Sequence, residues 1–156
     1  MNPPERARWA IVGVGNELNG DDAAGILALR ALKQRLVDRS DVLLIDAGTA
    51  PENFTSLLRG FAPDKVLFID AAQMDLPPGQ SAWLEVEQID GVSASTHTLP
   101  LTVLAGYLQA DLGCRVQVVA VQVERVGFGL QVSETVVRGV ERLVEELAEM
   151  FGEEKS

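Results

Sequence analysis

The sequence predicts an α/β fold, a three-layer sandwich with a mostly parallel twisted sheet, one antiparallel edge strand and helices on both faces. Four runs are almost continuously apolar, as in strands buried on both faces of a parallel sheet: residues 8–15, 41–48, 64–71 and 114–123. Segments with helical periodicity separate them. Because these elements alternate over 156 residues with no internal repeat or linker, we expect one domain spanning residues 1–156.

Two helices are predicted in the first half of the chain. After residues 8–15, apolar side chains recur at steps of three and four residues, which is the stripe of a helix packed on a sheet: Ile26, Leu29, Leu32 and Leu36. Asp21 or Asp22 is expected to cap this helix. Residues 51–61 fit a short second helix with Pro51 in its first turn, where the missing N–H is tolerated.

The edge strand and a third helix are predicted next. Residues 81–90 alternate apolar and polar side chains, which favours an edge strand with one wetter face. A helix is expected within residues 96–113. Thr98 is its expected cap, Pro100 is expected in its first turn, and Gly113 is the stop signal.

The chain ends in an amphipathic helix that is predicted to start at Ser133. Its polar face is acidic. Its apolar residues fall on one stripe, which we expect to pack on the sheet: Val136, Val140, Leu143, Leu147 and Met150.

Composition excludes several classes of partner and compartment. The net charge of −10 disfavours nucleic acids and anionic membrane surfaces, because both repel an acidic protein. No apolar stretch approaches the roughly 20 residues that span a bilayer, and no secretory signal pattern is present. We therefore expect a cytoplasmic monomer. The single cysteine, Cys114, allows no intramolecular disulfide, and its position at the start of an apolar run predicts a core residue.

Polar residues follow the predicted strands at one edge of the sheet. Asp21 and Asp22 come after the first strand, Asp46 ends the second and Asp70 ends the third. His97, the only histidine, lies in a loop that leads into a helix. Right-handed crossovers place the carboxyl ends of parallel strands at the same edge, where ligands of open α/β sheets bind. Carboxylates with one imidazole suit a divalent transition metal.

A nucleotide site is the alternative at this edge. Gly13 and Gly15 match the start of a dinucleotide fingerprint, and Asp46 imitates its ribose-binding acid. However, Leu18 replaces the third glycine, and Asp21 and Asp22 put negative charge where a pyrophosphate docks. Structural roles also stay open, because paired aspartates often cap a helix and a lone histidine is often part of the core.

Four motifs in order resemble the hydrogenase maturation endopeptidases, which process the large subunit of nickel-iron hydrogenases. The motifs are "GVGNELNGDDAAG", "IDAGTAPEN", "LFIDAAQMDLPPG" and "THTLPL", and the resemblance runs from about residue 9 to about residue 144. "IDAGTAPEN", "DLPPG" and "VQVERVGF" are most similar to the branch that serves formate-hydrogenlyase-type hydrogenases.

The resemblance implies roles for individual residues. Three match the family's metal ligands, which are also its catalytic residues: Asp22, Asp70 and His97. Asp46 and Asn16 match residues that support the site. One position departs from the family pattern, because Ala47 stands where many members have a glycine.

The implied reaction is hydrolysis of one peptide bond, which removes the C-terminal extension of the large-subunit precursor after nickel insertion. The cofactor is then nickel supplied by the precursor's own nickel-iron site, and other divalent metals substitute in vitro. The partner is the precursor, and no protein nucleophile is needed. The remaining alternatives are a nucleotide-dependent enzyme that uses the Gly13–Gly15 turn and a non-catalytic metal-binding assembly module.

Overall fold

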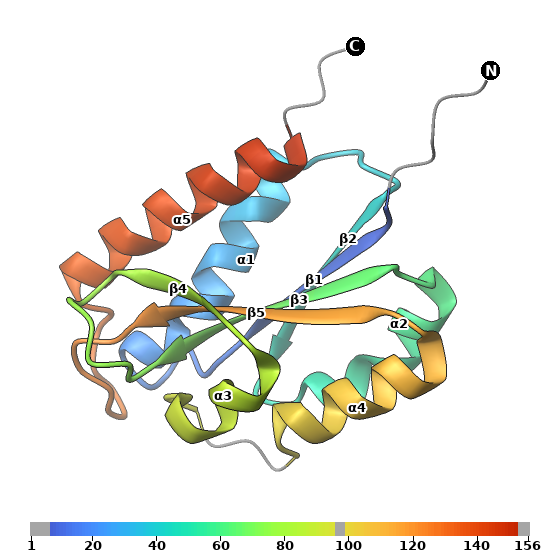
Figure 1. Cartoon of the computed structure of the whole chain (residues 1–156). Coiled ribbons are helices and arrows are strands. Elements are labelled where there is room, and N and C mark those ends of the chain that lie inside the picture. Colours follow the sequence, from blue (N-terminus) through green and yellow to red (C-terminus); the bar gives the residue numbers. More distant parts are fainter. Residues whose placement is uncertain (1–6, 96–98, 153–156) are drawn as a thin grey trace.

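The computed structural model describes residues 7–95 and 99–152 and contains a five-stranded sheet in the order β2-β1-β3-β5-β4 (Figure 1). The strands are β1 Trp9–Val14, β2 Val42–Gly48, β3 Lys65–Ala72, β4 Ser81–Leu84 and β5 Arg115–Gln122. All neighbouring strands are parallel except β4, which pairs antiparallel with β5 at the edge. The predicted fold class is confirmed, because the four apolar runs form the parallel strands.

Helices cover both faces of the sheet, as predicted (Figure 1). One face carries α1 (Ala24–Arg35), which follows the 3₁₀ turn η1 (Asp21–Ala23), and α5 (Glu134–Gly152). The other face carries the remaining helices: α2 (Thr55–Phe61), which follows the 3₁₀ turn η2 (Pro51–Phe54), α3 (Val86–Val92) and α4 (Leu101–Leu112).

The continuous apolar runs are explained by two hydrophobic cores, one on each face. Along β3, Leu67 and Ile69 point into the core under α1 and α5, whereas Val66 and Phe68 point into the opposite core. All four side chains are fully buried. A strand covered on both sides has no wet face, so it shows no alternation of polar and apolar residues.

The prediction of a strand over residues 81–90 is wrong beyond Leu84. The chain turns there, and α3 begins at Val86. Glu85 and Gln88 form a capping box, in which the Gln88 side chain accepts a hydrogen bond of 2.9 Å from the Glu85 N–H. This reciprocal cap starts a helix where side-chain alternation had favoured a strand.

The predicted helix caps also need correction. Neither Asp21 nor Asp22 caps α1, because Ala23 is its N-cap residue and no side-chain cap bond is present. Both carboxylates bond to distant segments instead, as described below. Gly113 ends α4 in the left-handed conformation, as predicted.

Pro100 is the N-cap residue of α4 and not part of its first turn. Asp90 of α3 accepts hydrogen bonds from the N–H groups of Leu101 and Thr102, at 2.9 and 3.2 Å. The cap therefore comes from another helix. The expected cap, Thr98, lies outside the described residues.

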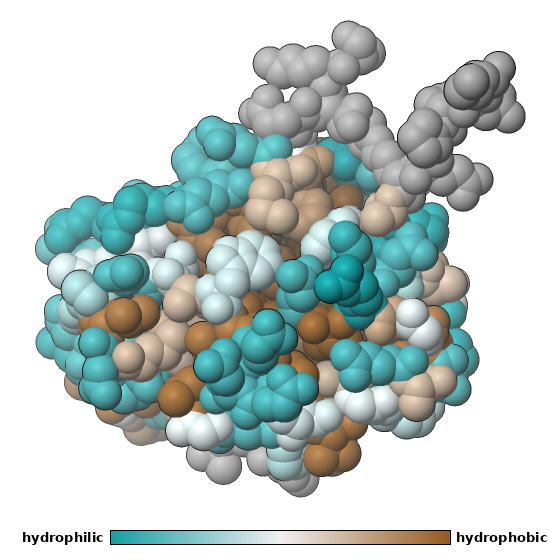
Figure 2. All heavy atoms as spheres, in the orientation of Figure 1, coloured by the Kyte–Doolittle hydropathy of each residue, from teal (hydrophilic) through white to brown (hydrophobic). Residues whose placement is uncertain are grey.

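The stripe of α5 is confirmed except at its last position. Val136, Val140, Leu143 and Leu147 are buried, but Met150 is 56% exposed. Phe151 takes its place and packs edge-on against Trp9, with the ring centroids 4.9 Å apart. With 3.6 residues per turn, a step of four from Leu147 to Phe151 continues the buried stripe. The outward side of α5 is hydrophilic (Figure 2).

Candidate active site at the carboxyl edge of the sheet

Two buried carboxylates lie at the carboxyl edge of the sheet. Asp70 is near the end of the central strand β3, and Asp22 is in η1, which follows β1. Their exposed fractions are 0% and 1%. Buried carboxylates need hydrogen bonds or a cation to offset the loss of water, so such a pair requires a specific partner.

Glycines allow η1 and α1 to pack directly on the strand ends. Gly15 has a φ of 153°, and a Cβ there would lie 2.2 Å from the carbonyl oxygen of Asp22. A Cβ at Gly25 would lie 2.3 Å from the carbonyl oxygen of Ile69, the residue before Asp70. These close contacts place Asp22 near the end of β3. The glycine turn after β1 therefore contacts protein backbone at the position where a phosphate would approach.

One short segment joins the two carboxylates. The Ser93 hydroxyl donates to Asp70 Oδ2 at 2.6 Å, and the Ser95 hydroxyl donates to Asp22 Oδ1. The Ala94 N–H donates to the Ala71 carbonyl at 2.8 Å, which pairs the segment with the end of β3. Residues 93–95 therefore connect Asp22 and Asp70 by donating a hydrogen bond to each carboxylate.

His97 follows this segment by two residues and lies outside the described part of the chain. Its predicted place in the site therefore stays a prediction. The described chain leads from Ser95, which is bonded to Asp22, toward that histidine.

Asp21 has a separate, structural role. It accepts four hydrogen bonds of 2.6–2.8 Å, from the N–H groups of Glu124, Arg125 and Ser133 and from the Ser133 hydroxyl. Burial by itself would raise the pKa of Asp21, but the hydrogen bonds outweigh it and the pKa is lowered. This carboxylate ties η1 to the loop between β5 and α5.

The two residues that were predicted to support the site both make contacts near it. Asp46 accepts a hydrogen bond of 2.9 Å from Arg30, which also pairs with Glu17 at 2.7 Å. Arg30 thereby connects the end of β2 to the loop after β1. The Asn16 side-chain oxygen accepts a hydrogen bond of 2.9 Å from the Leu18 N–H, and the backbone N–H of Asn16 donates to the Asp22 carbonyl at 3.2 Å.

Sequence reasoning missed the two serines of residues 93–95. Their positions four and two residues before His97 were the only available signal. A serine points to a site only when the acceptor of its hydroxyl group is known. The acceptors here, Asp70 and Asp22, are distant from Ser93 and Ser95 in the sequence.

The described residues by themselves do not form a metal-binding group. Within residues 7–95 and 99–152, no group of three His, Cys, Asp or Glu side chains is placed to hold a metal ion. Asp22 and Asp70 provide oxygen donors that suit a divalent cation. Two carboxylates alone do not make up the ligand set of a metal site.

Cys114 lies in the core, as predicted. It is 4% exposed, and its thiol faces the Leu108 carbonyl at 3.6 Å. Burial raises the pKa of the Cys114 thiol, which disfavours the reactive thiolate. A thiol mechanism therefore has no support here.

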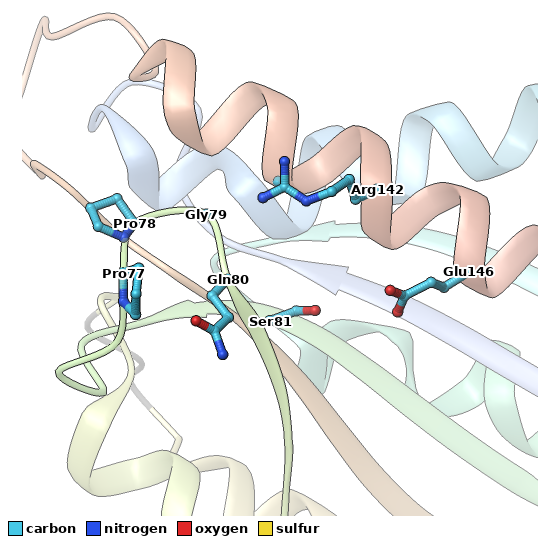
Figure 3. A pocket seen from close by; sticks show the side chains of 8 residues that line it. Pro77, Pro78, Gly79, Gln80, Ser81, Arg142 and Glu146 are labelled. Carbon is cyan, nitrogen blue, oxygen red and sulfur yellow. The ribbon is translucent and has the colours of Figure 1, made fainter.

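A separate pocket of about 290 Å³ lies between the turn before β4 and helix α5 (Figure 3). Pro77 to Ser81 form one side, and Arg142 and Glu146 of α5 lie across from them. Neither Asp22, Asp70 nor residues 93–95 line it. This pocket is therefore distinct from the carboxylate edge.

Known proteins resemble this chain over most of its length. The sequence profile described as hydrogenase maturation protease matches residues 26–150. The hydrogenase 3 maturation protease of Escherichia coli K12 is 33% identical over 135 residues, which cover 86% of this chain and 85% of the relative.

Solved structures agree with this similarity. The crystal structure of the nickel-iron hydrogenase maturation protease HycI from Thermococcus kodakarensis superposes with a TM-score of 0.84 at 34% identity, covering 94% of this chain and 93% of the other. The solution structure of the endopeptidase HycI from Escherichia coli gives a TM-score of 0.78 at 30% identity, covering 90% and 89%.

Proposed function

This chain belongs to the hydrogenase maturation protease family and is a peptide hydrolase, and from this premise we propose which bond it cuts and when. The substrate is the precursor of a nickel-iron hydrogenase large subunit. The reaction is one hydrolytic cut that removes the C-terminal extension after nickel has been inserted. Two relatives support the substrate class, since the Escherichia coli and the Thermococcus kodakarensis proteins are both hydrogenase maturation proteases.

The observation that carries the proposal is the linkage of Asp22 and Asp70 through residues 93–95. Both carboxylates are buried, and each accepts from a serine hydroxyl, which can rotate away when a cation approaches, while Asp70 keeps the hydrogen bond from the Ala71 N–H at 2.8 Å. The same segment continues to His97. We assign to Asp22, Asp70 and His97 the binding of the nickel that the precursor already holds.

Substrate-held nickel then serves recognition. When bound, such an ion polarises a carbonyl group or a water molecule. In the protein without substrate, Asp22 and Asp70 accept hydrogen bonds from the Ser95 and Ser93 hydroxyls. Asp46 and Asn16 support the loop that carries Asp22, through Arg30 and through the Leu18 N–H.

The carboxylate set explains why nickel is expected in the substrate. The chain lacks the His-Glu-x-x-His spacing with which zinc proteases hold their own metal. An incomplete set binds free metal weakly, whereas cysteine thiolates of the precursor complete the coordination and position the scissile bond. We propose no tightly held resident metal.

The test uses matched precursors, one loaded with nickel and one kept free of nickel by chelation. We expect the protein to cut only the loaded form, and His97→Ala to cut neither while its thermal melt stays close to that of the wild type. Equal cleavage of both precursors would favour a protease that carries its own metal. Normal cleavage by His97→Ala would remove this residue from the site.

We further propose that the protein acts in the cytoplasm as a monomer. Among the helices in the described parts of the chain, none is both long and apolar enough to cross a membrane. The net charge of −10 is unfavourable for binding to nucleic acid. Cell fractionation and sedimentation at micromolar concentration test the two statements.

A further inference from the structure

Two loops beside the carboxylate edge expose a group of apolar side chains. The loop before η1 contributes Leu18, which is 62% exposed. The loop between β5 and α5 contributes Val126, Phe128 and Leu130, which are 38%, 85% and 44% exposed. Single exposed apolar residues are common, whereas exposed apolar residues gathered on adjoining loops are typical of interaction sites. We call these four residues the loop-pair patch.

Backbone hydrogen bonds hold the two loops together. Gly129 N–H donates to the Leu18 carbonyl at 2.9 Å, and Gly127 N–H donates to the Asn19 carbonyl at 3.3 Å. Gly20 and Val126 form an isolated antiparallel bridge. The exposed side chains are therefore carried by a defined backbone and lie close together.

Hydrogen bonds connect the loops of the loop-pair patch to the segment that carries Asp22. Asp21 anchors Glu124, Arg125 and Ser133 at the two ends of the second loop, and Asp22 is the next residue in the chain. On the other loop, Asn16 bonds to the N–H of Leu18 and to the carbonyl of Asp22. The two loops of the patch are therefore tied by hydrogen bonds to the residues on either side of Asp22 along the chain.

We propose that the loop-pair patch is the docking surface for an apolar segment of the hydrogenase precursor beside the bond that is cut. The inference rests on the proposed function, since it assigns that same substrate to a surface next to the site. Burial of an exposed aromatic ring is a common source of affinity in protein interfaces, and Phe128 is the most exposed of the four. The patch adds affinity that does not depend on the nickel ion.

The experiment measures steady-state cleavage of the nickel-loaded precursor by the wild type, Phe128→Ser and Leu130→Ser. We expect KM to rise about tenfold in Phe128→Ser and less in Leu130→Ser, with kcat within about twofold of the wild type. Loss of binding that is equal in the ground state and the transition state raises KM alone. Thermal melts should be unchanged, because the removed side chains are exposed.

Val37→Ser is the matched control, because Val37 is 61% exposed and follows the C-terminal end of α1, away from the carboxylate edge. Its KM should equal that of the wild type. An unchanged KM in Phe128→Ser, or an equal rise in Val37→Ser, would overturn the docking surface while leaving the proposed function intact. A wild-type protein that cuts no precursor would overturn both.

A second readout separates substrate from self-association. The Asp22→Asn protein should bind the nickel-loaded precursor more weakly when Phe128→Ser is added. A wild-type dimer in sedimentation experiments that Phe128→Ser converts to monomers would instead assign the patch to a second copy of the chain and overturn the proposal.

Discussion

Two neighbouring aspartates serve two different regions of this molecule. Asp21 is bonded to the loop between β5 and α5, mainly by backbone N–H groups that cannot move without local unfolding. Asp22 accepts from the Ser95 hydroxyl, in the segment that also bonds to Asp70. Both are buried. The difference teaches that the kind of donor, more than burial, separates a structural carboxylate from one suited to exchange partners.

The largest expected effect is on the cleavage rate when Asp22 or Asp70 is changed. Asp22→Asn and Asp70→Asn should each lower the cleavage rate by more than about 100-fold, which exceeds the usual effect of removing a group that only orients a metal ligand. Each amide keeps the shape but loses the charge. The measurement is cleavage of nickel-loaded precursor, beside circular dichroism to verify folding. A rate within a factor of about ten of the wild type would contradict the assignment.

The next largest effect is on the free energy of unfolding when Asp21 is changed. Asp21→Ala should lower the free energy of unfolding by about 2–4 kcal/mol, because it leaves several buried N–H groups without their acceptor. Asp22→Asn should change it by less than about 1 kcal/mol, since the amide oxygen can still accept from Ser95. Urea unfolding of the three proteins measures both values. Equal losses in the two variants would remove the contrast between the regions.

The stability that Asp21 contributes should depend on pH. The folded-state pKa of Asp21 is lowered, so its stabilising effect is fully present above the unfolded value near 3.8 and is lost as pH falls through the folded value. The stability advantage of the wild type over Asp21→Asn should therefore shrink below pH 3.8. Urea midpoints at several pH values test this, and an advantage that grew on acidification would contradict it.

A smaller effect on stability is expected at Gly25, where α1 packs directly on the ends of β1 and β3. Gly25→Ala should destabilise the fold by about 1–3 kcal/mol and slow cleavage, because the new Cβ would collide with backbone oxygens of Ile69 and Val14. Gly60→Ala in α2 is the control, since a Cβ there meets no atom within 4 Å. It should stabilise by up to about 1 kcal/mol through helix propensity alone. Similar thermal shifts in both variants would argue against the close packing.

The smallest effect is expected at Arg30. Arg30→Gln removes the ion pairs to Glu17 and Asp46, but the side chains are partly exposed and solvent screens them. The loss of stability should be less than about 1 kcal/mol. Thermal melts at low and high salt check this, and a larger loss would assign Arg30 a structural role comparable to that of Asp21.

Local patterns determined most of the fold. Apolar runs predicted the four parallel strands, and the stripe Ile26, Leu29, Leu32 and Leu36 predicted α1, because periodicity reflects which face of an element is buried. The errors have two sources, a second local signal and packing against a distant segment. The Glu85 capping box ends the strand that alternation favoured over residues 81–90, and packing against Trp9 buries Phe151, whereas the predicted stripe residue Met150 is exposed.

The sequence by itself also placed Asp22 and Asp70 at one edge, since parallel strands put their carboxyl ends on the same side. Only the tertiary structure decided the division of labour between Asp21 and Asp22. Their donors lie about 70 to 110 residues away in the chain. A carboxylate's role depends on which groups replace the water it loses on burial, and those groups are known only after distant segments have packed together.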